Sequence, residues 1–197
     1  MTDRIGPTPH MDPEGLRCFQ ETLATSKCYL EYGSGGSTVY ARDVAKVPLV
    51  ISIESDKAWS DKVCASIQNA DARLLMHHCD LGEVGDWSFP KTKDRIGDFW
   101  TYSVNPWQTA RAATVVPDTI LIDGRFRVAT FLYSLLCARV GTTILFDDYL
   151  DRPYYFVVEN FCRLRESRGR MGVFTVAQNF SMPDIAAAIA KYSIVWD

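Results

Sequence analysis

Acidic side chains recur at the ends of short apolar segments along this chain. Each of five such segments ends near a carboxylate, and the residues are Glu31, Glu54, Asp80, Asp123 and the pair Asp147-Asp148. A single acid in such a place usually caps a helix or a turn, but capping rarely accounts for five in succession. Carboxylates also accept hydrogen bonds from hydroxyl groups and bind hard cations. The pattern therefore favours a binding or catalytic site lined with carboxylates.

A glycine-rich turn follows the first of these segments. The apolar run 28–32 leads into Gly33-Ser34-Gly35-Gly36, and a helix is expected to begin at Ser37-Thr38. Glycines allow positive φ and let a ligand approach the backbone without meeting a Cβ atom. The N–H groups at a helix start favour electron-rich or anionic groups. An ordinary strand-to-helix turn would contain the same glycines, but together with the carboxylates the turn favours a site for a nucleotide-like cofactor.

The segments that carry these residues alternate between strand-like and helix-like patterns. Apolar runs predict strands at 28–32, 49–53, 73–78, 119–123, 142–146, 173–177 and 193–196. Helical patterns predict helices at 13–25, 37–45, 57–69, 128–140, 153–165 and 183–191. This alternation indicates an α/β fold with a mostly parallel sheet and right-handed crossovers. Because ligands bind at the carboxyl ends of parallel strands, we expect the acids and the glycine turn to meet there.

The length and the linkers indicate one domain. A chain of 197 residues fits a single core, and we expect residues 14–197 to form it after a poorly ordered arm of residues 1–13. The connection 80–109 interrupts the alternation. It carries six aromatic residues, which argue against disorder. Two interpretations stay open: a lid that faces the substrate, or a satellite core packed over the sheet.

Composition and charge disfavour several classes of function. The formal net charge is −3 and the pI is about 5.6, so no nucleic-acid partner is expected. The sequence has no signal-peptide pattern and no apolar run long enough to cross a bilayer; we therefore expect no membrane partner and a cytoplasmic location. The six cysteines form no C-x-x-C pair, which disfavours a zinc ribbon. No pattern indicates the oligomeric state.

The acids after the second and third strands suit a nucleoside. Glu54 lies 23 positions after Glu31, a spacing that suits an acid accepting hydrogen bonds from the two ribose hydroxyls of a nucleoside cofactor. Asp80 is placed either to contact the base or to cap a turn. The spacing does not decide between these two roles.

With these motifs the chain resembles the class I S-adenosylmethionine-dependent methyltransferases over about residues 27–197. The resemblance rests on the motif from Leu30 to Thr38, on Glu54, on Asp80 and on Leu121-Ile122-Asp123-Gly124. It implies a Rossmann-like, doubly wound sheet of about seven strands, mostly parallel with an antiparallel last strand and helices on both faces. It also implies an S-adenosylmethionine site, with Ser37 departing from the third glycine of many members. The implied cofactor-binding residues are Glu31, Gly33, Ser34, Gly35, Gly36, Ser37, Glu54, Ser55, Asp80 and Asp123.

A narrower resemblance is to metal-dependent O-methyltransferases of the catechol and macrolide-sugar type. Those enzymes carry one Asp after the fourth strand and an acidic pair after the fifth, and the matching residues here are Asp123, Asp147 and Asp148. Three carboxylates at one strand edge suit Mg²⁺, which would lower the pKa of a substrate hydroxyl. The alternative is that Asp147 or Asp148 only caps the following turn.

The chain departs from the catechol-type enzymes at the catalytic base. Those enzymes place a lysine shortly after the fourth-strand Asp, whereas this chain has Arg125 and Arg127. Arginine stays protonated and is a poor base, but its guanidinium binds anions bidentately. The candidate catalytic residues are therefore Asp123, Arg125 and Asp148, with either the metal alone activating the acceptor or a chemistry that differs from this subgroup.

The resemblance and the residues together predict a methyltransferase that acts on a small hydroxylated acceptor, with O-methylation favoured. The expected cofactors are S-adenosylmethionine and, at the three aspartates, Mg²⁺. One alternative is a methyltransferase-like binding protein without catalysis, because no general base matches. Another is an NAD(P)-dependent oxidoreductase, although Thr38 stands where the dinucleotide fingerprint has its third glycine.

Overall fold

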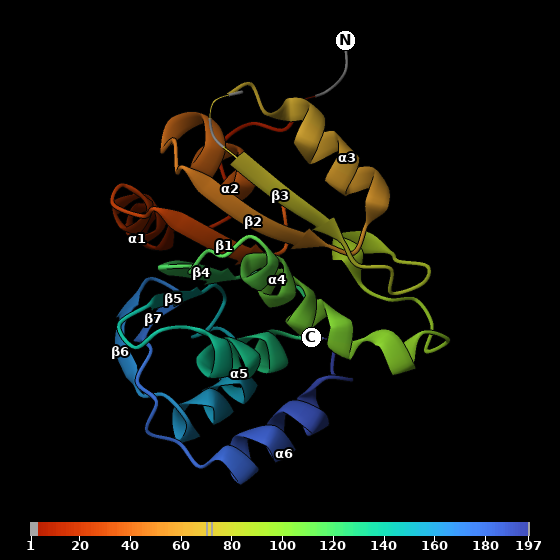
Figure 1. The fold of residues 1–197 in the computed structure, drawn as a ribbon, viewed down its shortest axis with the longest axis vertical. Coiled ribbons are helices and arrows are strands. Elements are labelled where there is room, and N and C mark those ends of the chain that lie inside the picture. Colours follow the sequence, from red (N-terminus) through yellow and green to blue (C-terminus); the bar gives the residue numbers. More distant parts are fainter. Residues whose placement is uncertain (1–3, 70, 72, 197) are drawn as a thin grey trace.

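The computed structural model describes residues 4–69, 71 and 73–196. Its centre is one seven-stranded sheet in the order β3-β2-β1-β4-β5-β7-β6, with helices on both faces (Figure 1). The strands are β1 (Cys28–Tyr32), β2 (Leu49–Glu54), β3 (Arg73–His78), β4 (Thr119–Ile122), β5 (Thr143–Phe146), β6 (Leu164–Arg168) and β7 (Met171–Thr175). The helices are α1 (Pro13–Leu23), α2 (Gly36–Val39), α3 (Lys57–Ser66), α4 (Trp100–Ala112), α5 (Arg127–Cys137) and α6 (Met182–Tyr192).

The strand order creates a topological switch point between β1 and β4. Strands β1 to β5 are parallel, and β7 runs antiparallel between β5 and β6. The register aligns Tyr32 with both Ile53 and Ile122, and Ile122 with Phe146. The carboxyl ends of β1, β2, β4 and β5 therefore lie side by side, and the turns that follow them share one edge of the sheet.

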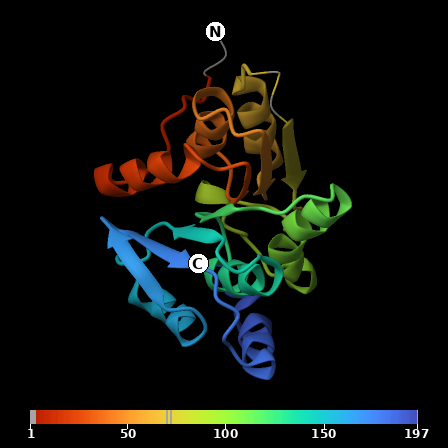
Figure 2. The same cartoon turned by 60° about the vertical axis from the view of Figure 1, so that its left-hand side comes forward.

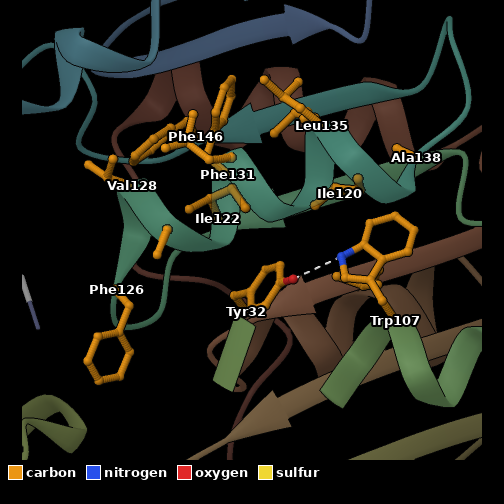
Figure 3. Close-up of a cluster of buried hydrophobic side chains, with 14 of the residues drawn as sticks. Tyr32, Trp107, Ile120, Ile122, Phe126, Val128, Phe131, Leu135, Ala138 and Phe146 are labelled. Atoms are coloured by element: carbon orange, nitrogen blue, oxygen red, sulfur yellow. Dashed lines mark hydrogen bonds between the residues drawn. The ribbon is translucent and has the colours of Figure 1, made fainter. Parts of the chain in front are cut away.

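The central strands are buried on both faces, as their continuous apolar runs predict. Leu30, Ile122 and Phe146 belong to a core cluster with α4, α5 and α6 on one face, whereas Leu121 and Leu145 pack with α1 on the other. In the first cluster the Tyr32 hydroxyl accepts a hydrogen bond of 3.0 Å from the Trp107 indole (Figure 3). This packing fixes the end of β1 against α4, close to the glycine turn.

The structure confirms the predicted fold class, with an antiparallel strand as the last in the chain. Two predicted elements differ in the structure. The predicted helix 153–165 is a 3₁₀ segment, Pro153–Asn160, followed by β6. The predicted strand 193–196 was wrong, because no strand follows α6 among the described residues. A β-hairpin occupies this edge of the sheet instead. Gly169 adopts φ +60° and turns the chain so that β7 pairs with both β6 and β5. Figure 2 shows this hairpin at the edge of the sheet away from β3.

The connection 80–109 contains α4 as well as a loop. The helix begins at Trp100 and holds Pro106 in its interior. Buried residues occur around much of the helix, among them Tyr102, Val104 and Trp107, so the sequence shows no single apolar stripe. Part of the aromatic content therefore forms core over the sheet, and residues 80–99 remain as the loop.

The described part of the N-terminal segment, residues 4–12, crosses the sheet edge beside the glycine turn. The Ile5 amide donates to the Ser66 hydroxyl at 3.0 Å, and the Asp12 side chain caps α1. The Arg170 guanidinium donates to the His10 carbonyl at 2.8 Å. A Cβ built on Gly36 would come within 2.4 Å of the Thr8 carbonyl oxygen. Close packing thus holds residues 8–10 on the turn. Within the described residues, no helix has the length and apolar character to span a membrane.

Candidate functional site

A cavity of about 730 Å³ opens at the carboxyl ends of the strands. This volume suits a small-molecule ligand or cofactor. The cavity runs from the glycine turn to the turns after β4 and β5. Its lining residues are Pro9, His10, Gly33, Ser34, Gly35, Gly36, Ser37, Glu54, Asp56, Trp59, Gly85, Asp86, Trp87, Ser88, Phe89, Tyr102, Asp123, Gly124, Arg125, Arg127, Asp147, Asp148, Arg152 and Arg170.

The glycine turn needs its glycines for two different reasons. Gly33 has φ +89°, and a Cβ there would lie 2.9 Å from the Gly124 Cα, so Gly33 lets the turns after β1 and β4 touch. Gly35 has open space instead: among the described residues, and apart from its chain neighbours, the only atom within 4 Å of its built Cβ is on the Trp59 ring, at 3.8 Å. A side chain at Gly35 would therefore extend into the cavity without displacing the fold.

Glu31 lies beneath the turn and outside the cavity lining. It is fully buried and accepts hydrogen bonds from the hydroxyls of Tyr29 at 2.9 Å, Ser37 at 2.8 Å and Thr38. Burial raises the pKa of Glu31, and these hydrogen bonds oppose that rise. In this structure Glu31 anchors the start of α2 from below.

Glu54 joins the glycine turn, the end of β2 and the loop after β3. Its Oε2 accepts from the Ser34 amide and hydroxyl, both at 3.1 Å. Its Oε1 accepts from the amides of Ser55 at 2.8 Å and Asp56 at 3.0 Å, and from the Ser88 hydroxyl at 2.7 Å. Two serine hydroxyls therefore bond to one carboxylate, which is the bonding that a ribose diol would require.

Asp80 lies outside the cavity lining. It forms an ion pair with Arg95 at 3.0 Å and accepts from the Gly82 amide at 2.9 Å. On this side of the cavity the loop residues Trp87, Ser88 and Phe89 and the α3 residue Trp59 provide the walls. Sequence reasoning did not assign a role to Trp59 or to His10, whose ring centroid lies 5.8 Å from that of Trp87. Only tertiary packing brings these side chains together.

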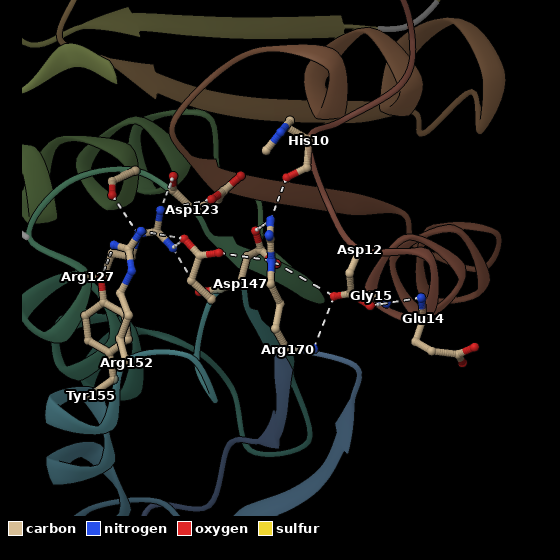
Figure 4. A network of polar contacts seen from close by, with 12 residues as sticks. His10, Asp12, Glu14, Gly15, Asp123, Arg127, Asp147, Arg152, Tyr155 and Arg170 are labelled. Atoms are coloured by element: carbon tan, nitrogen blue, oxygen red, sulfur yellow. Dashed lines mark hydrogen bonds and ion pairs between the residues drawn. The ribbon is translucent and has the colours of Figure 1, made fainter. Parts of the chain in front are cut away.

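The turns after β4 and β5 hold a dense network of carboxylates and guanidiniums (Figure 4). Arg127 pairs with Asp123 at 3.1 Å and with Asp148 at 3.1 Å. Arg170 pairs with Asp147 at 3.0 Å and with Asp148 at 3.0 Å. Arg152 pairs with Asp148 at 2.9 Å. Each of the three carboxylates is therefore neutralised by at least one guanidinium.

Burial shifts the pKa values of this network. It raises the pKa of Asp123 to about 7, with Asp147 and Asp148 adding to the rise and Arg127 opposing it. Burial also raises the pKa of Asp147, against its hydrogen bonds to Arg170. Asp123 still has 27% of its side chain exposed, so solvent or a ligand can reach it. A carboxyl with a pKa near neutrality can exchange a proton at physiological pH.

Arg125 is the fourth guanidinium of the cavity and differs from the other three. It is buried, with 5% of its surface exposed, and its Cζ lies 4.0 Å from the Phe89 ring centroid. Within the part of the chain that the structure describes, its Nη1 has no hydrogen-bond partner. Burial, and then the charge of Arg127, lower its pKa.

The fold is similar to those of known proteins. No family model matches the sequence, and no curated protein matches it. Among solved structures, the fold is similar to that of a methyltransferase-like protein from Silicibacter pomeroyi, with 29% identity, a TM-score of 0.86, and coverage of 96% of this chain and 98% of that one. This likeness covers nearly the full length of both chains, and the seven-stranded mixed sheet is Rossmann-like. The chain has the class I methyltransferase fold.

Two further solved structures are similar at lower identity. Cofactor-bound Rv0187 from MTB is 14% identical, with a TM-score of 0.57 and coverage of 89% of this chain and 84% of that one. The N-methyltransferase NodS from Bradyrhizobium japonicum is 9% identical, with a TM-score of 0.45 and coverage of 84% and 98%. At 14% identity the likeness to Rv0187 concerns the fold alone.

The methyltransferase fold brings the three predicted metal ligands together, but their surroundings suit Mg²⁺ poorly. One ligand atom from each of Asp123, Asp147 and Asp148 lies within 4.8 Å of the others. Arg127, Arg152 and Arg170 already occupy these carboxylates at 2.9 to 3.1 Å. A dication at the same place would meet three positive charges at close range. The donor set therefore fits an arginine-neutralised network better than a magnesium centre.

Proposed function

We propose that this protein transfers a methyl group from S-adenosylmethionine to a hydroxyl oxygen of a small acceptor. The observation that carries the proposal is the continuity of one cavity, from the open face of the glycine turn to Asp123. A transferase needs donor and acceptor in a single space, held so that the reacting atoms are in line. We assign the methyl donor to the β2–β3 side of the cavity and the acceptor to the β4–β5 side, on either side of the switch point.

The β2–β3 side of the cavity fits the cofactor. Gly35 leaves the turn open to a ligand, and Glu54 already accepts two hydroxyl donors, from Ser34 and Ser88, that a ribose diol can replace. Carboxylates of Asp56 and Asp86 also line this side, and they favour a cationic ligand. When bound, S-adenosylmethionine supplies a methyl group activated by its positive sulfur.

Asp123 is the residue that we assign to the acceptor. It lines the cavity, remains partly exposed and has a pKa of about 7. In the proposed reaction the acceptor oxygen forms a bond to the methyl carbon, the carbon–sulfur bond breaks to leave S-adenosylhomocysteine, and the hydroxyl proton passes to an Asp123 carboxylate oxygen. Asp123 replaces the lysine base that this chain lacks.

The proposal does not use Mg²⁺ at the three aspartates. Arg127 and Arg170 hold Asp123, Asp147 and Asp148 in fixed positions, so these acids orient the acceptor pocket through arginine instead of through a metal. Arg127 also donates to the backbone carbonyls of Gly124 and Asp147 at 3.0 and 2.8 Å, which ties the turns after β4 and β5 together.

A second candidate function is a methyltransferase-like binding protein without turnover. The observation in its favour is that Asp123, the base that the proposed reaction uses, is paired with Arg127. The two candidates differ in a transfer assay with radiolabelled S-adenosylmethionine and a panel of small hydroxylated compounds. Transfer to an acceptor that produces one equivalent of S-adenosylhomocysteine supports the enzyme. Tight cofactor binding with no transfer to any compound supports the binding protein, and preferential binding of NADH would overturn both.

A further inference from the structure

The charges of the cavity are divided between its two sides. On the side of β2 and β3 the charged lining residues are all acidic, namely Glu54, Asp56 and Asp86. On the side of β4, β5 and β7 lie the four guanidiniums of the lining, which belong to Arg125, Arg127, Arg152 and Arg170. A cationic ligand group is therefore favoured on the first side and an anionic one on the second.

Three of these four guanidiniums are already paired with carboxylates. Arg127, Arg152 and Arg170 share Asp123, Asp147 and Asp148. Arg125 has no carboxylate within 4.0 Å among the described residues, and its Nη1 lacks any hydrogen-bond partner there. The acceptor side thus has one guanidinium more than it has acids, and the surplus charge is at Arg125.

A buried guanidinium without a counter-charge is costly, because desolvation is not offset by an ion pair. Arg125 is 5% exposed, and the Phe89 ring, 4.0 Å from its Cζ, covers it. A ring contacts a guanidinium through its face, while the N–H groups point outward in the guanidinium plane. The bonding capacity that remains at Arg125 therefore suits a planar or tetrahedral oxyanion.

We propose that the acceptor carries an anionic group, a carboxylate or a phosphate monoester, and that the Arg125 guanidinium binds it. This inference rests on the proposed function and names its substrate class. Arg125 follows Asp123 by two residues, so a small molecule can place its anionic group at Arg125 and its reacting hydroxyl at Asp123. Arg125 is then a specificity-determining residue, and Phe89 holds its guanidinium in place.

The test is calorimetric and does not depend on turnover. S-adenosylhomocysteine is first titrated into the protein, and the saturated complex is then titrated with meta-hydroxybenzoate, its neutral amide meta-hydroxybenzamide, and phenyl phosphate. Meta-hydroxybenzoate tests a carboxylate and phenyl phosphate tests a phosphate monoester as the anionic group. We expect at least one anion to bind about 10-fold or more tightly than the amide, because a charge-assisted bidentate contact is lost in the amide.

Variants locate the anion. Arg125→Gln is expected to weaken binding of the anion by about 10- to 100-fold and to leave affinities for the amide and for S-adenosylhomocysteine within about two-fold. Arg139→Gln makes the same change of charge at an exposed site after α5 and is expected to have no effect. If Arg125→Gln does not fold, the comparison of anion and amide in the wild type still tests the inference.

The outcomes separate the inference from the proposed function. If S-adenosylhomocysteine binds but no anion binds more tightly than the amide, the inference is overturned and the proposed function stands. If Arg125→Gln weakens S-adenosylhomocysteine and not the anion, Arg125 holds the cofactor's carboxylate and the inference is again overturned. If S-adenosylhomocysteine does not bind at all, the proposed function fails and the inference fails with it.

Discussion

At the scale of single residues, Asp123 combines three properties that a proton acceptor needs. It lines the cavity, its carboxylate is held by Arg127 at 3.1 Å, and its pKa is raised to about 7. Arg127 is held in turn by the Asp147 carbonyl and by Asp148. The orientation of Asp123 is therefore fixed by residues from two different strand ends.

Replacing Asp123 tests its role in the reaction. Asp123→Asn keeps the volume of the side chain and leaves Arg127 paired with Asp148, so the fold is expected to persist. We expect the rate of methyl transfer to fall by about 100-fold or more, the usual contribution of a general base, with the affinity for S-adenosylhomocysteine within a few-fold. Single-turnover transfer and calorimetry measure the two quantities. An equal loss of rate and of cofactor affinity would contradict the role.

The raised pKa of Asp123 also predicts a pH dependence of stability. Folding raises this pKa from 3.8 to about 7, so the folded state binds the proton more tightly than the unfolded chain. The stabilisation is fully present below the unfolded pKa and is lost as the pH rises through about 7. Asp123→Asn cannot ionise, so its unfolding free energy relative to wild type should increase between about pH 5 and about pH 8. Denaturant unfolding at both pH values measures this, and an unchanged difference would contradict the raised pKa.

At the scale of elements, the loop after β3 is held over the cavity by a few polar and aromatic contacts. Ser88 donates to Glu54, Phe89 covers Arg125, and Trp87 contacts His10. Trp87 and Ser88 both adopt the left-handed region, with φ of +56° and +60°. Non-glycine residues in this region often occur at binding sites. The loop and residues 9 and 10 thus form two walls of the cavity on the side that we assign to the cofactor.

Ser88 gives a test of the cofactor side. If the ribose hydroxyls replace the serine hydroxyls on Glu54, Ser88→Ala removes a competitor for the carboxylate. We therefore expect Ser88→Ala to bind S-adenosylhomocysteine as tightly as wild type or up to about five-fold more tightly. Glu54→Gln should weaken binding by about 10-fold or more. Calorimetry on both variants checks the assignment, and a similar loss in the two would show that Ser88 binds the cofactor itself.

Some strands and helices follow directly from the sequence, and others do not. The central strands were predictable because each is a short run of apolar residues, such as Ile120-Leu121-Ile122, buried on both faces. Strand β6 was not, because its residues Arg165 and Glu166 are exposed and the segment shows no apolar run. Helix α4 was missed because its buried aromatic residues lie around Pro106 without a helical stripe.

For the candidate site, the sequence predicts the residues at the strand ends but not their partners. The positions of Gly33, Glu54 and Asp123 follow from the ends of the strands, since a parallel sheet brings these ends together. The partners of the acids do not follow. Arg170 belongs to the β6–β7 turn and reaches Asp147 across 23 residues of sequence, and His10 comes from the N-terminal segment. Such contacts arise only from tertiary structure, so three acids that suggested a metal centre are found paired with arginines.

At the scale of the whole molecule, the arginine network predicts that transfer needs no divalent cation. Because Arg127, Arg152 and Arg170 neutralise the three aspartates, we expect EDTA to leave the rate of methyl transfer unchanged. Added Mg²⁺ should leave it unchanged as well. The assay compares initial rates for EDTA-treated and Mg²⁺-supplemented protein. Loss of activity in EDTA that Mg²⁺ restores would show that the carboxylates bind a metal despite their arginine partners.

The proposed transfer requires that the cavity beside the glycine turn bind S-adenosylmethionine. Calorimetric titration of S-adenosylhomocysteine into wild type, Gly35→Val and Gly97→Val tests this binding. A side chain at position 35 would enter the cavity, whereas Gly97 is exposed in the 3₁₀ segment Ile96–Asp98, and among the described residues no atom beyond its chain neighbours lies within 4 Å of its built Cβ. We expect micromolar binding to wild type and to Gly97→Val, and none to Gly35→Val. Absence of binding to wild type, or equal binding to all three, would contradict it.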